Sequence, residues 1–365
     1  MRFARVDRNA GRVDGLRRMK HLSLIAGQRP ALALLTWFSV TGCAESFKVR
    51  NEAVPPELER QLHAQAAPLS ETKVVKGGLT VRSRSVPPPE GVLKVPMYYE
   101  NGIPHIKVSL NGRKPKKFML DTGATYSVFD AEQAVEYGMK TIPQVRPQMS
   151  GVLGREPGMA ALISTVQIGS WRLENLPCII RMQRTTAGSG ILKEQFGVSV
   201  LGVHLAANHC KYLTLDFLKG DVEFGFSASF PGQRRKHMHK APLSMNLGVP
   251  TTTLKYRRFT WEAVVDSGSV FGVQLDQNTA SVLGYKNGGW HVGGEYLITG
   301  VGGAQSPKEA GVRVLEVPAL GLFGSFYPFA EIDVMPGPSR LGTYLLEDYR
   351  VTLDFEHKTL WVEWG

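Results

Sequence analysis

The chain contains one eight-residue motif twice, and this repeat limits the folds open to it more than any other feature. Phe118–Thr125 reads Phe-Met-Leu-Asp-Thr-Gly-Ala-Thr, and Ala263–Val270 reads Ala-Val-Val-Asp-Ser-Gly-Ser-Val. In each copy an apolar strand runs into an acidic residue, a hydroxyl residue and a glycine. Each copy therefore places a carboxylate in a tight turn at the end of a buried strand. Internal repeats set the architecture of a chain, so we predict two homologous lobes.

The repeat extends beyond the two acidic residues. Leu201-Gly202 follows the first, and Leu341-Gly342 follows the second at a similar distance. Leu213–Phe217 and Val351–Phe355 come next, and the sequence Thr-Leu-Asp-Phe is identical in both. A single acid before a hydroxyl residue and a glycine is often an ordinary turn at the end of a strand. The recurrence of every landmark in the same order favours a shared active site instead.

These motifs resemble those of the retropepsin-like aspartic proteases, in the single-chain, two-lobed form of a bacterial lipoprotein. The resemblance covers residues 96–365 and implies an all-β protein with the two-lobed aspartic-protease fold, also called the acid protease barrel. Two homologous retropepsin-like lobes would hold the active site between them. The resemblance implies an aspartic-type endopeptidase, a hydrolase that acts on a peptide or protein substrate and needs no cofactor and no metal.

The chemistry of such a site explains the residue types. Two carboxyls about 3 Å apart cannot both ionise, so they share one proton, and one acts as a base toward water while the other acts as an acid toward the carbonyl oxygen. We predict that Asp121 and Asp266 form this catalytic pair. A glycine lacks the Cβ that would separate two backbones, and a hydroxyl can hydrogen-bond across the interface. The predicted support for the active-site loops is therefore Thr122, Gly123, Ser267 and Gly268.

The rest of the chain reads as strands and turns. Ile106–Leu110 alternates between apolar and polar residues, and Asn111-Gly112 is a strong hairpin signal before the strand that leads to the first acid. Each lobe is predicted to close with a hairpin, over residues 212–226 and 351–363. The convincing helices are short ones near Val203–Asn208 and Thr343–Tyr349, just after the Leu-Gly turns.

Two glycine-rich segments are candidate flaps over the cleft. One lies at residues 150–154 and the other at residues 299–303, at similar distances after the two acids. Mobile hairpins at these places would close on a peptide and exclude water, although each segment alone is equally compatible with a simple turn. The flap candidates are Gly151, Val152, Gly154, Gly300 and Gly302.

The N-terminal region resembles a bacterial export signal. Basic residues precede Ala31–Val40, an apolar stretch that is too short to span a bilayer. Val40–Cys43 then resembles a lipobox, in which the cysteine becomes the acylated first residue. We predict a lipoprotein-type signal peptide over residues 1–42 and lipidation of Cys43. A plain secretory signal with an incidental cysteine is the alternative.

A lipidated Cys43 would anchor the protein in the bacterial cell envelope, facing the periplasm. The alanine that follows the cysteine favours the outer membrane by the same resemblance. Residues 43–95 contain proline-rich, polar sequence and are predicted to be a tether with one short helix near Glu57–Ala67. Lobe 1 is then expected over residues 96–231 and lobe 2 over residues 232–365.

Charge and cysteine content limit the other kinds of function and site that the chain could have. The formal net charge is +11, but residues 1–42 hold eight Lys or Arg and two Asp or Glu, so most of the excess is N-terminal. No arginine-rich helix or aromatic stacking surface follows, so nucleic-acid binding is not predicted. Cys178 and Cys210 would lie in an oxidising compartment, where they form either a disulfide or two buried thiols. The cysteines are too scattered for a metal site.

Some residues depart from the protease pattern. Ser339-Arg340-Leu341-Gly342 has a basic residue where Val200 stands in the first lobe, and bulky residues follow the second acid. A catalytically degenerate, peptide-binding envelope lipoprotein with the same fold is therefore the main alternative. A structural lipoprotein with a β-sandwich is a weaker one, because it does not explain the duplicated acids.

Overall fold

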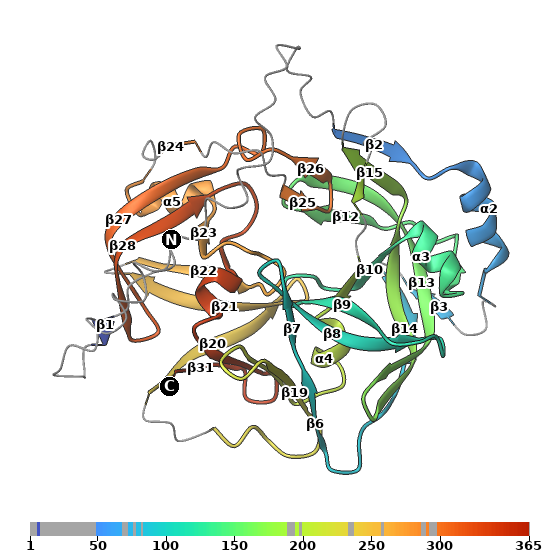
Figure 1. Cartoon of the computed structure of the whole chain (residues 1–365), viewed down its shortest axis with the longest axis horizontal. Coiled ribbons are helices and arrows are strands. Elements are labelled where there is room, and N and C mark those ends of the chain that lie inside the picture. The colour runs from blue at the N-terminus through green and yellow to red at the C-terminus, as the bar shows by residue number, and fades with distance from the viewer. Residues whose placement is uncertain are drawn as a thin grey trace, which may run out of the picture.

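The computed structural model describes residues 6–7, 49–67, 72–75, 78–81, 83–187, 194–196, 199–232, 237–256, 259–285, 290–291 and 298–364. Strands make up most of this part of the chain, and the helices in it are short (Figure 1). The predicted signal peptide and Cys43 lie outside the described residues, apart from the two-residue strand β1 at Val6–Asp7.

Lobe 1 is built on a sheet that closes on itself. Its strand order is β11-β13-β14-β10-β17-β9-β8-β7, and an additional pairing of β13 with β8 completes a barrel. The strands are β5 (Arg84–Val86), β7 (Tyr98–Glu100), β8 (Ile103–Leu110), β9 (Lys116–Asp121), β10 (Ser127–Asp130), β11 (Lys140–Ile142), β12 (Gln148–Gly151), β13 (Gly154–Ile168), β14 (Trp171–Arg181) and β17 (Ser199–Gly202).

Lobe 2 repeats this topology with its own strands. In lobe 1, β9 pairs parallel with β17, β17 pairs antiparallel with β10, and β10 pairs parallel with β14. In lobe 2 the same three pairings join β22 to β29, β29 to β23, and β23 to β28. The strands are β21 (Val249–Tyr256), β22 (Phe259–Val265), β23 (Val273–Leu275), β24 (Trp290–His291), β27 (Arg313–Leu322), β28 (Ser325–Val334) and β29 (Arg340–Leu341).

A continuous sheet joins the two lobes (Figure 1). Its order is β6-β19-β18-β30-β31-β20, formed by β6 (Val92–Pro96), β18 (Tyr212–Asp216), β19 (Asp221–Gly225), β20 (Met238–Asn246), β30 (Arg350–Asp354) and β31 (Thr359–Glu363). At its centre the repeated Thr214 and Thr352 face each other in register, and their hydroxyl oxygens are 2.8 Å apart. The pseudo-twofold axis therefore passes between β18 and β30. The predicted all-β, two-lobed acid protease fold is confirmed.

Local sequence explains the turns and helices. Asn111 and Gly112 both have positive φ, and they are the central residues of a tight turn after β8 that is closed by a hydrogen bond from the Arg113 N–H to the Leu110 carbonyl. The helices are α2 (Pro56–Ala64), α3 (Ala131–Glu136), α4 (His204–Ala207), α5 (Gln277–Val282) and α6 (Thr343–Leu346). The predicted helices near residues 57–67, 203–208 and 343–349 are confirmed. Helices α3 and α5 were not predicted, and each begins at an N-cap aspartate after the strand that follows a loop with one of the repeated acids.

The prediction of a tether over residues 43–95 is wrong for the described parts of that range. Leu62 of α2 is fully buried in the main core, β5 pairs with β14, and β6 is an edge of the sheet between the lobes. A further strand, β2 (Val49–Ala53), pairs with β15 (Gln183–Ala187), which also pairs with β16 (Glu194–Phe196). The small hairpins are β3 (Thr72–Val75) with β4 (Gly78–Val81), and β25 (Ile298–Gly300) with β26 (Gly303–Gln305).

Candidate active site

The two acids occupy equivalent places at the ends of equivalent strands. Asp121 is the last residue of β9, and Asp266 follows directly after β22. The Leu-Gly turns pack behind these loops. A Cβ on Gly202 would lie 2.4 Å from the carbonyl carbon of Tyr126, and one on Gly342 would lie 2.3 Å from the carbonyl oxygen of Phe271. Only glycine allows the backbone to approach the loops this closely.

Four hydrogen bonds join the loops across the lobe interface. The Thr122 hydroxyl donates to the Val265 carbonyl at 2.6 Å and accepts from the Ser267 N–H at 2.9 Å. The Ser267 hydroxyl donates to the Leu120 carbonyl at 2.6 Å and accepts from the Thr122 N–H at 3.0 Å. Both hydroxyl residues are fully buried. The predicted role of Thr122 and Ser267 in holding the loops in register agrees with this geometry.

Each loop glycine lies against the acid of the other lobe. A Cβ on Gly123 would lie 2.4 Å from Cγ of Asp266, and a Cβ on Gly268 would lie 2.3 Å from Cγ of Asp121. Each glycine also donates its N–H to the acid of its own loop, at 2.8 Å from Gly123 to Asp121 and at 2.9 Å from Gly268 to Asp266. The structure therefore brings the two acids together at the interface of the lobes.

Burial and mutual proximity perturb the carboxyl pair. Burial raises the pKa of Asp121 well above its ordinary value, and the neighbouring charge of Asp266 and a hydrogen bond between the two side chains raise it further. The N–H of Gly123 and the charge of Arg340 oppose this rise in pKa. Asp121 thus keeps a proton at a pH where an exposed aspartate has lost it, which is the behaviour of a shared-proton pair.

Arg340 makes the site asymmetric, because it contacts the acid of the second lobe. This contact was not predicted from the sequence. Its Nε lies 2.9 Å from Oδ2 of Asp266, and both side chains are about 10% exposed. Sequence reasoning identified Arg340 as a departure from the pattern, but it did not identify the partner of this cation. The available signal was a basic residue at the position where the first lobe has the apolar Val200.

The two glycine-rich segments form hairpins that meet each other. The first is the tip of β12–β13, where Gly151 pairs with Gly154, and the second is the tip of β25–β26. A Cβ on Gly151 would lie 2.6 Å from Cβ of Val301, and a Cβ on Gly302 would lie 2.5 Å from the carbonyl carbon of Leu153. Figure 1 shows both hairpins between the lobes, on the opposite side of the molecule from the sheet that joins them. Gly300 has open space around it.

The first flap candidate also reaches the second lobe through its side chains. Val152 and Leu153 pack against the buried side chains of Ala310, Val312 and Met335. The tip of one hairpin therefore rests on the other lobe and on the other hairpin. An extended peptide bound between them would have to displace these contacts.

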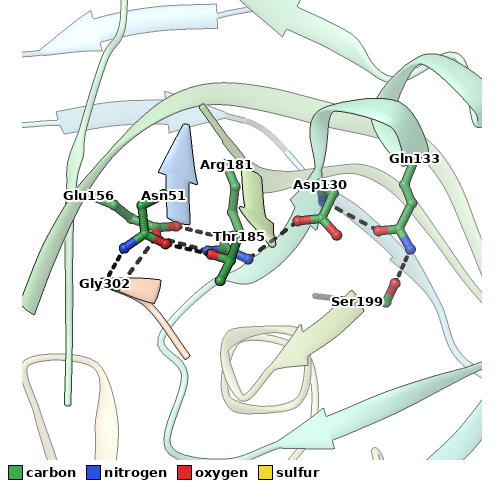
Figure 2. Close-up of polar contacts among 8 residues, drawn as sticks. All are labelled: Asn51, Asp130, Gln133, Glu156, Arg181, Thr185, Ser199 and Gly302. Atoms are coloured by element: carbon green, nitrogen blue, oxygen red, sulfur yellow. Dashed lines mark hydrogen bonds and ion pairs between the residues drawn. The ribbon is translucent and has the colours of Figure 1, made fainter. Parts of the chain in front are cut away.

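A buried ion cluster behind the flap candidates was missed by sequence reasoning (Figure 2). The Arg181 guanidinium donates to both carboxylate oxygens of Glu156 at 2.6 and 2.9 Å, and it lies 3.5 Å from Asp130. Glu156 accepts the N–H of Gly302 at 3.1 Å, so the cluster connects β13 with the tip of the other hairpin. The sequence gives only a weak signal for this cluster. Glu156 and Arg181 are 25 residues apart, and the pairing of β13 with β14 brings them together.

Neither remaining cysteine in the described residues forms a disulfide. Cys178 and Cys210 are buried free thiols, and Cys178 lies 3.9 Å from the sulfur of Met139. Of the two alternatives for this pair, the disulfide is therefore wrong. Within the described ranges, no group of His, Cys, Asp and Glu side chains is arranged to hold a metal ion.

Comparison with known proteins agrees with this geometry. Residues 106–203 match the family model described as aspartyl protease, a segment that contains Asp121 and the first Leu-Gly turn. The chain is an aspartic-protease-like protein. The comparison with curated proteins found no significant match.

Two solved structures are similar in shape to this chain at low sequence identity. One is an aspartic proteinase from Irpex lacteus, with 11% identity, a TM-score of 0.43 and coverage of 75% of this chain and 97% of that chain. Another is basic 7S globulin from soybean, with 11% identity, a TM-score of 0.42 and coverage of 75% of this chain and 95% of that chain.

Proposed function

We propose that this protein is an aspartic endopeptidase that hydrolyses peptide bonds with a water molecule activated by Asp121 and Asp266. The observation that supports the proposal most is the position of each acid against the glycine of the opposite loop. The buried hydroxyls of Thr122 and Ser267 hold both loops through hydrogen bonds across the lobe interface. The two carboxyls are therefore held in place before substrate binds. A preorganised pair of this kind stabilises a transition state rather than a ground state.

The reaction would proceed by general acid–base catalysis without a covalent enzyme intermediate. One carboxylate removes a proton from water, and the protonated partner donates to the carbonyl oxygen of the scissile bond. The product of this step is a geminal diol, which collapses when the amide nitrogen is protonated. The hairpins at Gly151 and Gly302 would open to admit the peptide and then cover it.

The proposal is tested by digesting a peptide library with the purified chain from acid to neutral pH. We expect cleavage by the wild type, inhibition by a statine-type transition-state mimic, and no effect of chelators. Asp121→Asn and Asp266→Asn should each lower kcat at least about 100-fold, because neither half of a shared-proton pair replaces the other. Both variants should remain folded by circular dichroism. Unchanged cleavage in either variant contradicts the proposal.

The second candidate function is peptide binding without cleavage, and one observation favours it. The cation of Arg340 contacts Asp266, where it competes with the water that a peptidase must activate. In this case the purified chain would retain peptides from the library at every pH and release no fragments.

We also propose that Cys43 anchors the protein in the bacterial cell envelope. The support is the lipobox-like sequence around it. Separately, no helix in the described part of the chain is long and apolar enough to cross a bilayer. Several acyl chains hold a protein stably on a membrane, whereas one binds only marginally. The wild type should therefore stay with membranes in a salt wash, and Cys43→Ser should release it or block its processing. Recovery of the unmodified wild type from a soluble periplasmic fraction would contradict the anchor.

A further inference from the structure

We propose that Arg340 is a positioning residue that assigns the roles of the two acids: it holds Asp266 as the carboxylate and leaves the shared proton on Asp121. Asp266 is then the base that activates water, and Asp121 is the acid that protonates the substrate carbonyl. This inference rests on the proposed peptidase function.

The contact that carries the inference is buried and specific. Arg340 Nε lies 2.9 Å from Asp266 Oδ2, and an Nη donates to the Pro338 carbonyl at 3.3 Å. Arg340 lies on β29, which runs parallel to β22 in the register Val264 to Arg340 and Val265 to Leu341. The arginine is therefore fixed by the strand beside the one that delivers Asp266. A guanidinium stays charged at any pH at which a protein remains folded, so the cation is permanent.

The equivalent position in lobe 1 has no charge. Val200 stands on β17 beside β9, in the same place as Arg340 beside β22. Val200 is buried in a small apolar cluster with Val128 and Met149. In the described part of the chain no ion pair involves Asp121, whereas Asp266 has a cation in direct contact. A symmetric pair would share its proton equally, but this pair cannot.

The other ionisable groups near Arg340 do not offset this asymmetry. Gln274, its partner on β23, is neutral, and Asp276 is occupied by Ser339 and by the start of α5. Among the described residues, the charges that act on Asp121 are those of Asp266, at the end of β22, and Arg340, on β29. In a site of low dielectric constant, one contact cation favours ionisation of the acid it touches much more strongly than that of the farther acid.

The first chemical step is balanced with this assignment. An O–H bond of water breaks, its proton passes to a carboxylate oxygen of Asp266, and the oxygen forms a bond to the substrate carbonyl carbon. The π electron pair moves to the carbonyl oxygen, which takes the proton of Asp121. After this step Asp266 is protonated and Asp121 is a carboxylate, so the pair still holds one proton. Arg340 then lies beside a neutral Asp266, which can return its proton to the leaving amine.

The inference predicts specific effects of two substitutions. Arg340→Met keeps the length of the side chain and removes the charge, so we expect kcat to fall about 10-fold to 100-fold with KM changed less than about 3-fold. The bell-shaped pH profile should move to higher pH, because Arg340 opposes the raised pKa of Asp121. Arg340→Lys restores a cation and should return the profile toward that of the wild type. Arg172→Met is the matched control, because Arg172 belongs to an exposed ion pair of lobe 1. It should change neither kcat nor the pH profile.

A second readout needs no catalysis. In protein labelled with ¹³C at the aspartate carboxyls, with Asp121→Asn and Asp266→Asn used for assignment, the protonated member of the pair should be Asp121 in the wild type. In Arg340→Met the pair should titrate at higher pH. A proton on Asp266, or an unchanged titration in Arg340→Met, overturns the inference whether or not the chain cleaves peptides. Absence of cleavage by the wild type overturns the proposed function alone.

Discussion

Two buried hydroxyl groups connect the loops that carry Asp121 and Asp266. The Thr122 hydroxyl makes two of the four cross-lobe hydrogen bonds, and the N–H of Ser267 has this hydroxyl as its acceptor. Because Thr122 is fully buried, water cannot replace the hydroxyl. The threonine thus has a structural role in addition to its place beside the acid.

We expect Thr122→Ala to lower the free energy of unfolding by about 2–3 kcal/mol, since it leaves a buried donor and a buried acceptor without partners. Thr122→Ser keeps the hydroxyl and loses only a methyl group, so it should cost about 1 kcal/mol. Denaturant unfolding of the three proteins measures the difference. Equal losses in both variants would show that the methyl group, not the hydrogen bonds, stabilises the loop.

At this scale the sequence predicted the acids, hydroxyls and glycines because each is required by a local turn and appears twice. It did not predict the partner of Arg340 or the pairing of Glu156 with Arg181. Those contacts depend on which strands lie side by side, and a strand pairing between distant segments leaves no local pattern. Arg181 ends an apolar run, which indicates an unusual environment without naming the partner.

At the scale of elements, the N-terminal strand β2 connects to the second flap candidate. The side-chain oxygen of Asn51 accepts a hydrogen bond from the Thr185 hydroxyl of β15 at 3.0 Å. Its amide nitrogen donates to the Gly302 carbonyl at 3.4 Å. Gly302 also donates its N–H to Glu156. Both backbone groups of Gly302, at the tip of the β25–β26 hairpin, are therefore hydrogen-bonded to side chains of other elements (Figure 2).

We expect Asn51→Asp to loosen this hairpin selectively, because the carboxylate still accepts from Thr185 but cannot donate to Gly302. Asn51 is exposed, so the free energy of unfolding should fall by no more than about 1 kcal/mol. Hydrogen–deuterium exchange over residues 298–305 should become faster. Asn246→Asp removes a comparable exposed amide donor elsewhere and should leave this exchange unchanged. Slower or unchanged exchange in Asn51→Asp would contradict the role of Asn51.

The elements themselves were predicted unevenly. The closing hairpins and the helices after the Leu-Gly turns follow from repeated local sequence. Strand β2 and helix α2 were assigned to a tether because their polar, proline-rich sequence buries little by itself. In the structure they are stabilised by lobe 1, where Leu62 fills a core position that composition does not reveal.

At the scale of the whole molecule, a buried arginine lies in the sheet that joins the lobes. Arg350 on β30 is 2.7 Å from Glu363 of lobe 2 and 3.4 Å from Asp216 of lobe 1. The Glu363 side chain is fully buried and the Arg350 side chain is 4% exposed. Loss of the cation would leave carboxylates from both lobes without compensation.

Arg350→Leu should therefore lower the free energy of unfolding by about 3–5 kcal/mol, as expected when one partner of a buried ion pair is removed. Arg172→Leu removes an ion pair of similar length whose arginine is 52% exposed, and it should cost about 1 kcal/mol or less. Urea unfolding compares the two variants. A small loss in Arg350→Leu would mean that the carboxylates take up protons and need no cation.

The pairing of Thr214 with Thr352 has a consequence for the ancestry of such a chain. Thr214 on β18 lies opposite its repeat, Thr352, on β30. The strand is therefore complementary to a copy of itself, as in the interface of a twofold-symmetric homodimer. A single lobe with this strand could have assembled with a second copy before the two were fused. Such a homodimer would carry two copies of Arg340 or none. Because its two lobes differ in sequence, the fused chain places a cation beside one acid and leaves the equivalent position in the other lobe apolar.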